Sequence, residues 1–246
     1  MLTDLLLLSG NEIPFPEAQL TIHQPRIYEI AYIGEEALFT GCELLNFSKN
    51  VLDEKDKVLL ENKTNFDILI AILREQNAVM QKNRNCVMMV LALLFPGYEI
   101  ELTKNGIQLS KEGNVHTIVN ENYEDFKRTV NKILVYGQGS DTKSDFNPSG
   151  EMAKRIHAKL QKRHQKLAEQ QADANKKIDI ISRYISILTV AEEKDMNVFW
   201  QYTMYQLFDE FKRFELKTAY DMYIKAKLAG AQDLKEVEDW MQDIHA

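Results

Sequence analysis

The sequence predicts a mainly α-helical protein with a small antiparallel β-meander, an α+β fold arranged in two parts. Three observations indicate this class. The 246 residues include only 10 glycines and 5 prolines, about half of what average usage gives, so helix-breaking residues are scarce. Apolar residues recur at three- and four-residue steps over most of the chain, which is the spacing of a buried helix face. Between 98 and 119 they instead alternate with polar residues, as in a half-buried strand.

The first third of the chain begins with a short β-prone stretch and continues with helices. Residues 12–23 contain two prolines, which favours an edge strand or an extended arm. From Ile27 the apolar spacing predicts a short helix, a break at Gly34 and a longer helix. Two more helices are expected over 65–76 and 85–95, and the second is apolar on nearly all sides, as a core helix is.

A three-stranded meander and a further helix complete the first part. An Asn-Gly turn at 105–106 joins two alternating stretches, and residues 116–119 form the third strand. Asn120 or Asn122 is expected to cap the next helix, whose acidic first turn suits the positive end of the helix dipole. The first domain is therefore predicted to span residues 1–136.

A linker and a helical domain are predicted for the rest of the chain. Residues 137–150 are rich in Gly, Ser and Asp, a composition typical of loops. The C-terminal helical domain is placed at 151–246. It opens with a stretch, 151–177, that carries eight bases and three acids around one thin apolar seam, as a solvated helix does.

An aromatic helix dominates the last third. Nine aromatic residues lie between 199 and 223, Thr203 and Gln206 form a capping box before them, and Gly230 stands where a C-terminal cap belongs. The rings spread over more than one helix face, so one layer of neighbouring helices is not expected to cover them all. The residues expected on the inner face are Phe208, Phe211 and Met222.

The chain ends in a short amphipathic segment. Val237, Trp240, Met241 and Ile244 fall at steps of three and four residues, so they form one apolar stripe on a helix. Isolated helices shorter than about 12 residues are marginal in water. We therefore expect this stripe to dock on a surface.

Charge and hydropathy argue against several classes. The 37 acidic and 30 basic residues give a net charge of −7, which disfavours a chain that coats nucleic acid as a whole. Residues 151–177 could still lie along phosphates, but they lack an aromatic residue for base stacking, so a specific nucleic-acid reader is not expected. The apolar run 86–95 is about half of what a bilayer needs. Without a signal-peptide pattern, we expect a cytosolic protein that does not contact membranes.

Patterns that would carry chemistry are weak. His157 and His164 share one helix face, but no carboxylate joins them at i+3 or i+4, and the flanking cations would repel a divalent ion. The two glycines in 136–141 lack the Gly-Lys-Ser/Thr ending of a phosphate loop. Cys42 and Cys86 lie in apolar surroundings and are expected to be reduced and buried. We expect no enzymatic activity, no metal and no cofactor.

Two stretches resemble proteins encoded in the structural modules of tailed bacteriophages of Gram-positive hosts. The segment Leu20–Phe39 is similar to their opening strand, Gln-Pro turn and following Ile-Gly-Glu helix. The segment Tyr205–Phe214, together with Ala226–Leu234 and Glu238–Met241, is similar to their C-terminal ending. The resemblance carries no active-site residue. It implies a tail assembly chaperone or a minor tail or baseplate protein.

The resemblance and the residue patterns lead to one main expectation and two alternatives. The main one is a chaperone that shields apolar helices of a tail component, a tape measure or baseplate protein, in the host cytoplasm during assembly. The alternatives are a permanent virion part of the baseplate, tail or head-to-tail connector, and a nucleic-acid-associated factor that uses the basic helix 151–177. Self-association into a homo-oligomer is left open. The residues expected to contact the partner are Tyr205, Leu207, Phe214, Tyr223, Val237, Trp240, Met241 and Ile244.

Overall fold

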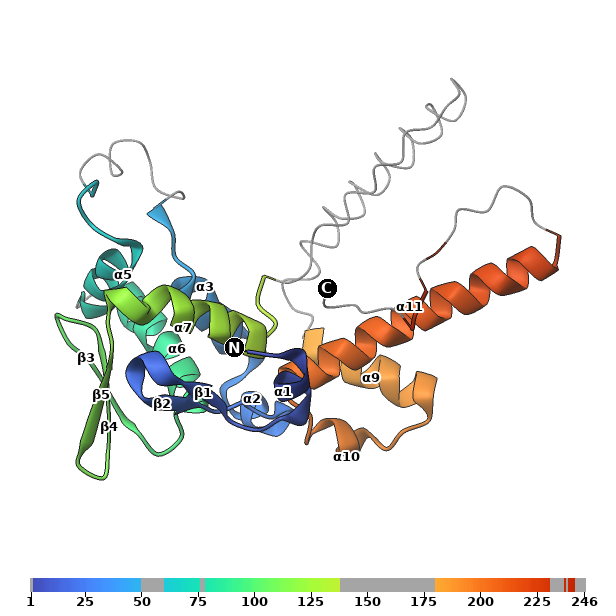
Figure 1. Cartoon of the computed structure of the whole chain (residues 1–246), viewed down its shortest axis with the longest axis horizontal. Helices are drawn as coiled ribbons and strands as arrows, with labels where there is room; N and C mark the ends of the chain where they lie inside the picture. The colour runs from blue at the N-terminus through green and yellow to red at the C-terminus, as the bar shows by residue number, and fades with distance from the viewer. Residues whose placement is uncertain are drawn as a thin grey trace, which may run out of the picture.

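Helices dominate the computed structural model, and its strands form two small antiparallel sheets (Figure 1). The α+β prediction is thereby confirmed. The structure describes residues 2–49, 60–75, 78–137, 180–230, 237 and 239–241. The predicted linker beyond Gly137 and the predicted basic helix lie outside these residues. The division into two domains therefore stays a prediction.

The N-terminal stretch forms a short helix, a hairpin and then two more helices. The elements are α1 (Asp4–Ser9), β1 (Ile13–Phe15), the 3-10 turn η1 (Pro16–Ala18), β2 (Leu20–Ile22), α2 (Ile27–Ile33) and α3 (Glu35–Leu45). Strands β1 and β2 pair antiparallel, with Phe15 opposite Leu20. Both end residues of each strand are buried and the middle one is exposed, so the expected extended stretch folds back on itself with one face in the core.

The core of the first part is built on α5 (Asn65–Arg74) and α6 (Ala78–Leu94). Helix α6 begins seven residues earlier than predicted, because residues 81–85 are polar and show no apolar periodicity. Helices α3 and α6 approach closely at Gly41. A Cβ atom there would lie 2.6 Å from Val90 Cγ2 and 2.8 Å from the Cys86 carbonyl oxygen, so a side chain at this position would push the two helices apart.

The meander and the next helix follow the sequence prediction. The elements are β3 (Glu99–Leu102), β4 (Ile107–Lys111), β5 (Asn114–Ile118) and α7 (Asn120–Ile133), and the strand order is β3-β4-β5. Gly106, in the predicted turn, lies so close to β5 that a Cβ would stand 2.1 Å from the Ile118 carbonyl oxygen. The side chain of Asn122 caps α7, since its Oδ1 accepts a hydrogen bond from the Val119 amide at 2.9 Å.

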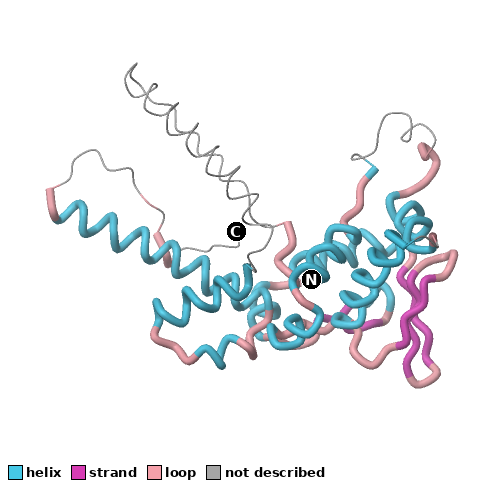
Figure 2. Tube along the Cα trace, turned by 180° about the vertical axis from the view of Figure 1, so that it is seen from behind, coloured by secondary structure: helices cyan, strands magenta, loops and turns pink. Residues whose placement is uncertain are grey.

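The C-terminal helices pack against the first part (Figure 2). They are α9 (Ile180–Glu192), α10 (Met196–Phe199) and α11 (Met204–Leu228). The carboxylate of Glu35, at the start of α3, accepts hydrogen bonds from the amides of Ile180 at 2.7 Å and Ile181 at 2.8 Å. A carboxylate satisfies the free amides of a helix N-terminus and suits its dipole, so α3 fixes where α9 begins.

A backbone seam joins α2 to the turn before α11. The Ile27 amide donates to the Tyr202 carbonyl at 2.8 Å, and the Arg26 guanidinium donates to the Gln201 carbonyl at 2.6 Å. Arg26 also forms a β-bridge with Thr203, the N-cap residue of α11. Arg26 and Ile27, one side of this seam, lie within the first stretch that resembles the phage proteins, so that stretch helps to position the start of α11.

Candidate partner-binding groove

Helix α11 extends well beyond the helices that pack against it (Figure 1). With 25 residues it is about 38 Å long, whereas α9 has 13 residues and spans about 20 Å. The buried residues of α11 are Met204, Tyr205, Leu207 and Phe211. Farther along, Met222 is 66% exposed and Leu228 is 83% exposed. The two halves of the helix therefore meet different surroundings.

The first half of α11 is fixed by aromatic contacts with α9. The ring of Tyr184 stacks on Phe211 with centroids 3.7 Å apart and planes inclined by 6°. The same tyrosine meets the edge of Phe208 at 5.0 Å. On another side of α11, the Tyr205 hydroxyl binds the carboxylate of Asp4 in α1 at 3.0 Å. Two neighbours thus cover two faces of this half.

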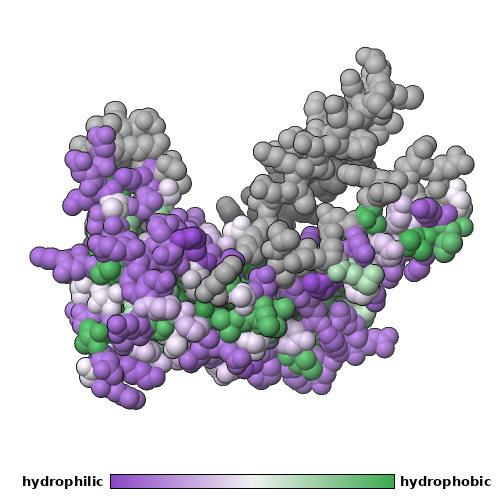
Figure 3. All heavy atoms as spheres, in the orientation of Figure 1, coloured by the Kyte–Doolittle hydropathy of each residue, from purple (hydrophilic) through white to green (hydrophobic). Residues whose placement is uncertain are grey.

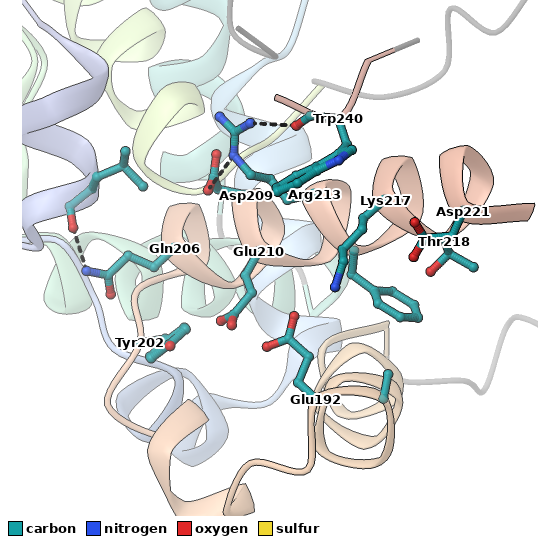
Figure 4. A pocket seen from close by; sticks show the side chains of 13 residues that line it. Glu192, Tyr202, Gln206, Asp209, Glu210, Arg213, Lys217, Thr218, Asp221 and Trp240 are labelled. Atoms are coloured by element: carbon teal, nitrogen blue, oxygen red, sulfur yellow. Dashed lines mark hydrogen bonds and ion pairs between the residues drawn. The ribbon is translucent and has the colours of Figure 1, made fainter. Parts of the chain in front are cut away.

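A groove of about 680 Å³ runs along α11, between the end of α9, the end of α1 and Trp240 (Figure 4). Its floor is one side of α11, where polar residues follow one another at three- and four-residue steps. These residues are Gln206, Glu210, Arg213, Lys217 and Asp221. Aromatic walls come from Tyr202, Phe214 and Trp240, so the groove combines charged groups with flat apolar surfaces.

An ion cluster closes the α9 end of the groove. The ammonium of Lys194 lies 2.7 Å from the Glu192 carboxylate and also binds the Glu210 carboxylate. Burial raises the pKa of Glu210. Burial alone would raise the pKa of Glu192 too, but the hydrogen bond from Lys194 brings it below its usual value. Burial would lower the pKa of Lys194, yet its two carboxylate partners raise it. Lys194 therefore stays charged and holds two carboxylates together.

The opposite wall of the groove is the C-terminal segment. Arg213 Nη1 donates a hydrogen bond to the Trp240 carbonyl oxygen at 3.1 Å, and Arg213 Nε lies 3.8 Å from the Asp209 carboxylate (Figure 4). The Trp240 side chain is half-buried, and Met241 is 69% exposed. The C-terminal segment, which we expected to dock on a surface, thus contacts α11 of its own chain through Trp240.

The structure reverses part of the predicted division of faces on α11. Tyr205 and Leu207, expected to contact a partner, are buried inside the chain, because α1 covers one face and α9 another. Met222, expected inside, is exposed because α9 ends before reaching it. Phe211 is buried as expected, and Phe208 is half-buried. The remaining predicted partner residues are half-buried Phe214, Tyr223, Val237 and Trp240, exposed Met241, and Ile244, which lies outside the described residues.

Sequence reasoning missed the ion cluster and the wall formed by α1. Glu192, Lys194 and Glu210 come from two segments, and only the turn between α9 and α11 brings them together. Helix α1 has six residues and lies some 200 positions before its contact with Tyr205. No periodicity within one segment can signal either contact, since both depend on how distant segments pack.

The described residues offer no group of three His, Cys, Asp or Glu side chains that could hold a metal ion. Cys42 and Cys86 are both free and buried, as expected. Burial raises the pKa of the Cys42 thiol to about 12, so this thiol stays protonated at neutral pH and is a poor nucleophile. In the part of the chain described, no helix combines the length and hydropathy needed to cross a bilayer. The absence of enzymatic activity stays a prediction.

Comparison with known proteins connects the C-terminal helices with phages. Residues 173–245 match a phage-derived family described as the YomV second domain. The matched region includes α9, α10, α11 and the segment around Trp240, which together form most of the groove. No curated protein and no solved structure matches the chain. The match supports a phage protein.

Proposed function

We propose that the protein is a non-enzymatic interaction factor in bacteriophage tail assembly. It acts in the host cytoplasm as a chaperone that shields apolar helices of a tail component, a tape measure or baseplate protein. The observation that carries the proposal is the second half of α11, which presents apolar side chains beyond the body of the protein within the region matched to a phage family.

The exposed end of α11 has the chemistry of a helix-binding surface. Met222 and Leu228 are exposed, and Tyr220, Tyr223 and Ile224 are only half-buried. Figure 3 shows hydrophobic side chains at this end of the helix, next to hydrophilic ones. Apolar patches rimmed by polar residues mark interaction sites, and methionine side chains adapt to differently shaped partners. This surface suits an amphipathic partner helix that would otherwise expose its own apolar face.

The tail role is supported by the resemblance and by the placement of its residues. The first resembling stretch contains one side of the seam that fixes the start of α11, and the second begins at Tyr205, inside α11. Both stretches therefore contribute to the part of the molecule that carries the exposed helix. Four charged residues of the groove, Glu192, Asp209, Glu210 and Arg213, bind a charged neighbour or the backbone, as in a structural or docking surface.

The proposal is tested by co-expressing the protein with tail proteins of the same phage. We expect it to co-purify with the tape measure or a baseplate protein, and the double variant Met222→Ser, Leu228→Ser to lose that partner. The matched control is Lys212→Ser, which changes an exposed polar residue on the same helix. Finished particles should lack the protein. Its stoichiometric presence in purified particles would instead indicate a permanent part of the virion.

A further inference from the structure

The segment around Trp240 returns along α11 and contacts it 27 residues before Trp240 in the sequence, at Arg213. It contributes one wall of the groove, and the other walls belong to α9, the turn before α11 and α1. In Figure 4 the indole of Trp240 lies beside the Arg213 side chain, over α11. One wall of the groove is therefore a segment that follows the last helix, outside the packed helices.

The hold of this segment on α11 is slight. The Trp240 side chain is only half-buried, and Met241 is 69% exposed. The Met241 amide binds the Asp239 side chain at 3.0 Å, so this part of the segment satisfies its own backbone locally. Trp240 is not among the described residues that pack against the hydrophobic core. The segment can therefore dissociate from α11 without exposing that core.

The site on α11 that binds Trp240 contacts groups that other peptides also carry. Arg213 is positioned by Asp209 and binds the backbone carbonyl of Trp240, a group that every peptide carries. The specific element is the indole, which lines the groove together with Phe214 and Tyr202. An arginine donor and an aromatic-lined hollow together select a peptide segment with one aromatic residue.

The stretch of chain between Gly230 and Trp240, called the tether below, is long enough for Trp240 to contact Arg213 of the same chain. About ten residues separate Gly230 from Trp240, and such a chain spans at most about 33–36 Å when extended. The helix from Arg213 to Gly230 measures about 25 Å. The tether can thus reach, and its shortness gives the segment an effective concentration on the order of millimolar at its site on α11.

We infer that residues 237 and 239–241 form a releasable latch on α11. In this structure it occupies a binding site on α11 that suits peptide segments with an aromatic residue. A partner binds in the groove by displacing it. Because the latch has few contacts with α11, it can dissociate easily. Because the connecting chain is short, it also rebinds quickly. A partner therefore binds the groove only if it competes with the latch. The latch belongs to the chain itself and does not depend on the proposed role in tail assembly.

The first test observes the latch in the full-length chain. The protein has two tryptophans, so Trp200→Phe leaves Trp240 as the only indole. In that background we expect Arg213→Ala to shift the Trp240 emission to longer wavelength and to raise its iodide quenching constant at least twofold. Lys212→Ala, at the exposed neighbouring position, should change neither. The latch would be overturned if the Trp240 emission were already that of a solvent-exposed indole before the Arg213 change. It would also be overturned if the emission did not change after it.

The second test measures exchange, with a fluorescently labelled synthetic peptide of residues 231–246 as the probe. Full-length Trp240→Ala should bind this peptide at least tenfold more tightly than the wild type, because its internal competitor is weakened. Adding Arg213→Ala should remove that gain, provided that circular dichroism shows the helices intact. Equal binding to all three proteins, or binding to none, contradicts a displaceable latch. Neither test uses a tail protein, so the latch and the tail role can fail separately.

Discussion

The two halves of α11 differ in surroundings far more than in composition. The first half carries Tyr205, Phe208 and Phe211, and the rings meet α1 on one side and α9 on another. The second half carries Tyr220 and Tyr223, which no described helix covers to the same extent. The helix thus continues past its neighbours and still carries aromatic residues there.

This contrast separates what stabilises the fold from what is available to a partner. Burial of an aromatic ring contributes stability only where a second element removes it from water. Helix α9 provides that element over about half the length of α11, since it has about half as many residues. The exposed half gains little from folding and is free to contact a partner. The following changes test this division.

The largest effect is expected from Phe211→Ala. This ring is buried and stacked on Tyr184, so its loss should lower the free energy of unfolding by about 3–4 kcal/mol, as for other buried phenylalanines. Met222→Ala, in the exposed half, should change it by less than about 0.5 kcal/mol. Urea denaturation followed by circular dichroism measures both. Similar losses for the two variants would mean that the second half of α11 is also part of the core.

A smaller loss is expected from Lys194→Ala, which leaves Glu192 and Glu210 facing each other. Because the cluster is partly exposed, we expect the free energy of unfolding to fall by about 1–2 kcal/mol at about pH 7. Without the ammonium, repulsion raises the pKa of Glu210 further, and a raised folded-state pKa means stability that is present at low pH and lost as the pH rises. The deficit should therefore shrink toward about pH 5.

The same cluster offers a control for that prediction. In the Glu210→Gln background only one carboxylate remains, so Lys194→Ala should lower the free energy of unfolding by less than it does in the wild type. Lys212→Ala, an exposed position of α11 that does not line the groove, should lower it by under about 0.5 kcal/mol. Chemical denaturation across this pH range gives all these values. A deficit that grows on acidification would show that the cluster does not act through the paired carboxylates.

The two ends of α11 should differ as its halves do. Thr203 is buried and its hydroxyl accepts a hydrogen bond from the Gln206 amide at 3.3 Å, so Thr203→Ala should cost about 1–2 kcal/mol. Gly230 has a φ of 85°, which disfavours alanine, but its neighbourhood is open. Strain there can be relieved by fraying of the last turn, so Gly230→Ala should cost under about 0.5 kcal/mol. A larger cost at Gly230, measured by thermal unfolding, would show that the exposed end is held in place.

The smallest effect is expected from Leu228→Lys. Leu228 is 83% exposed, so little burial is lost, and a cation in the last turn suits the helix dipole. The free energy of unfolding should stay the same or rise by up to about 0.3 kcal/mol, while binding to a partner helix weakens. Calorimetry with the wild type alongside measures this change. A clear loss of stability would place Leu228 in contact with another part of the chain.

Local patterns predicted the type of most described elements. The Asn-Gly turn and the alternation around it gave the meander, because strand faces repeat every two residues. The capping box predicted the start of α11, since the Thr203 amide donates to the Gln206 side chain and the Gln206 amide donates to the Thr203 hydroxyl. The predicted start of α6 was wrong, because the polar residues 81–85 carry no apolar periodicity that would indicate a helix.

The sequence by itself determined the helical class, the meander, the helix caps and an aromatic helix followed by an apolar C-terminal stripe. Each of these depends on residues within a few positions of one another, and their interactions form in any packing of the chain. Only the tertiary structure decided which faces of α11 are covered, where the ion cluster forms and where Trp240 docks. Those contacts join segments far apart in the sequence, so their positions follow from the lengths and packing of neighbouring helices.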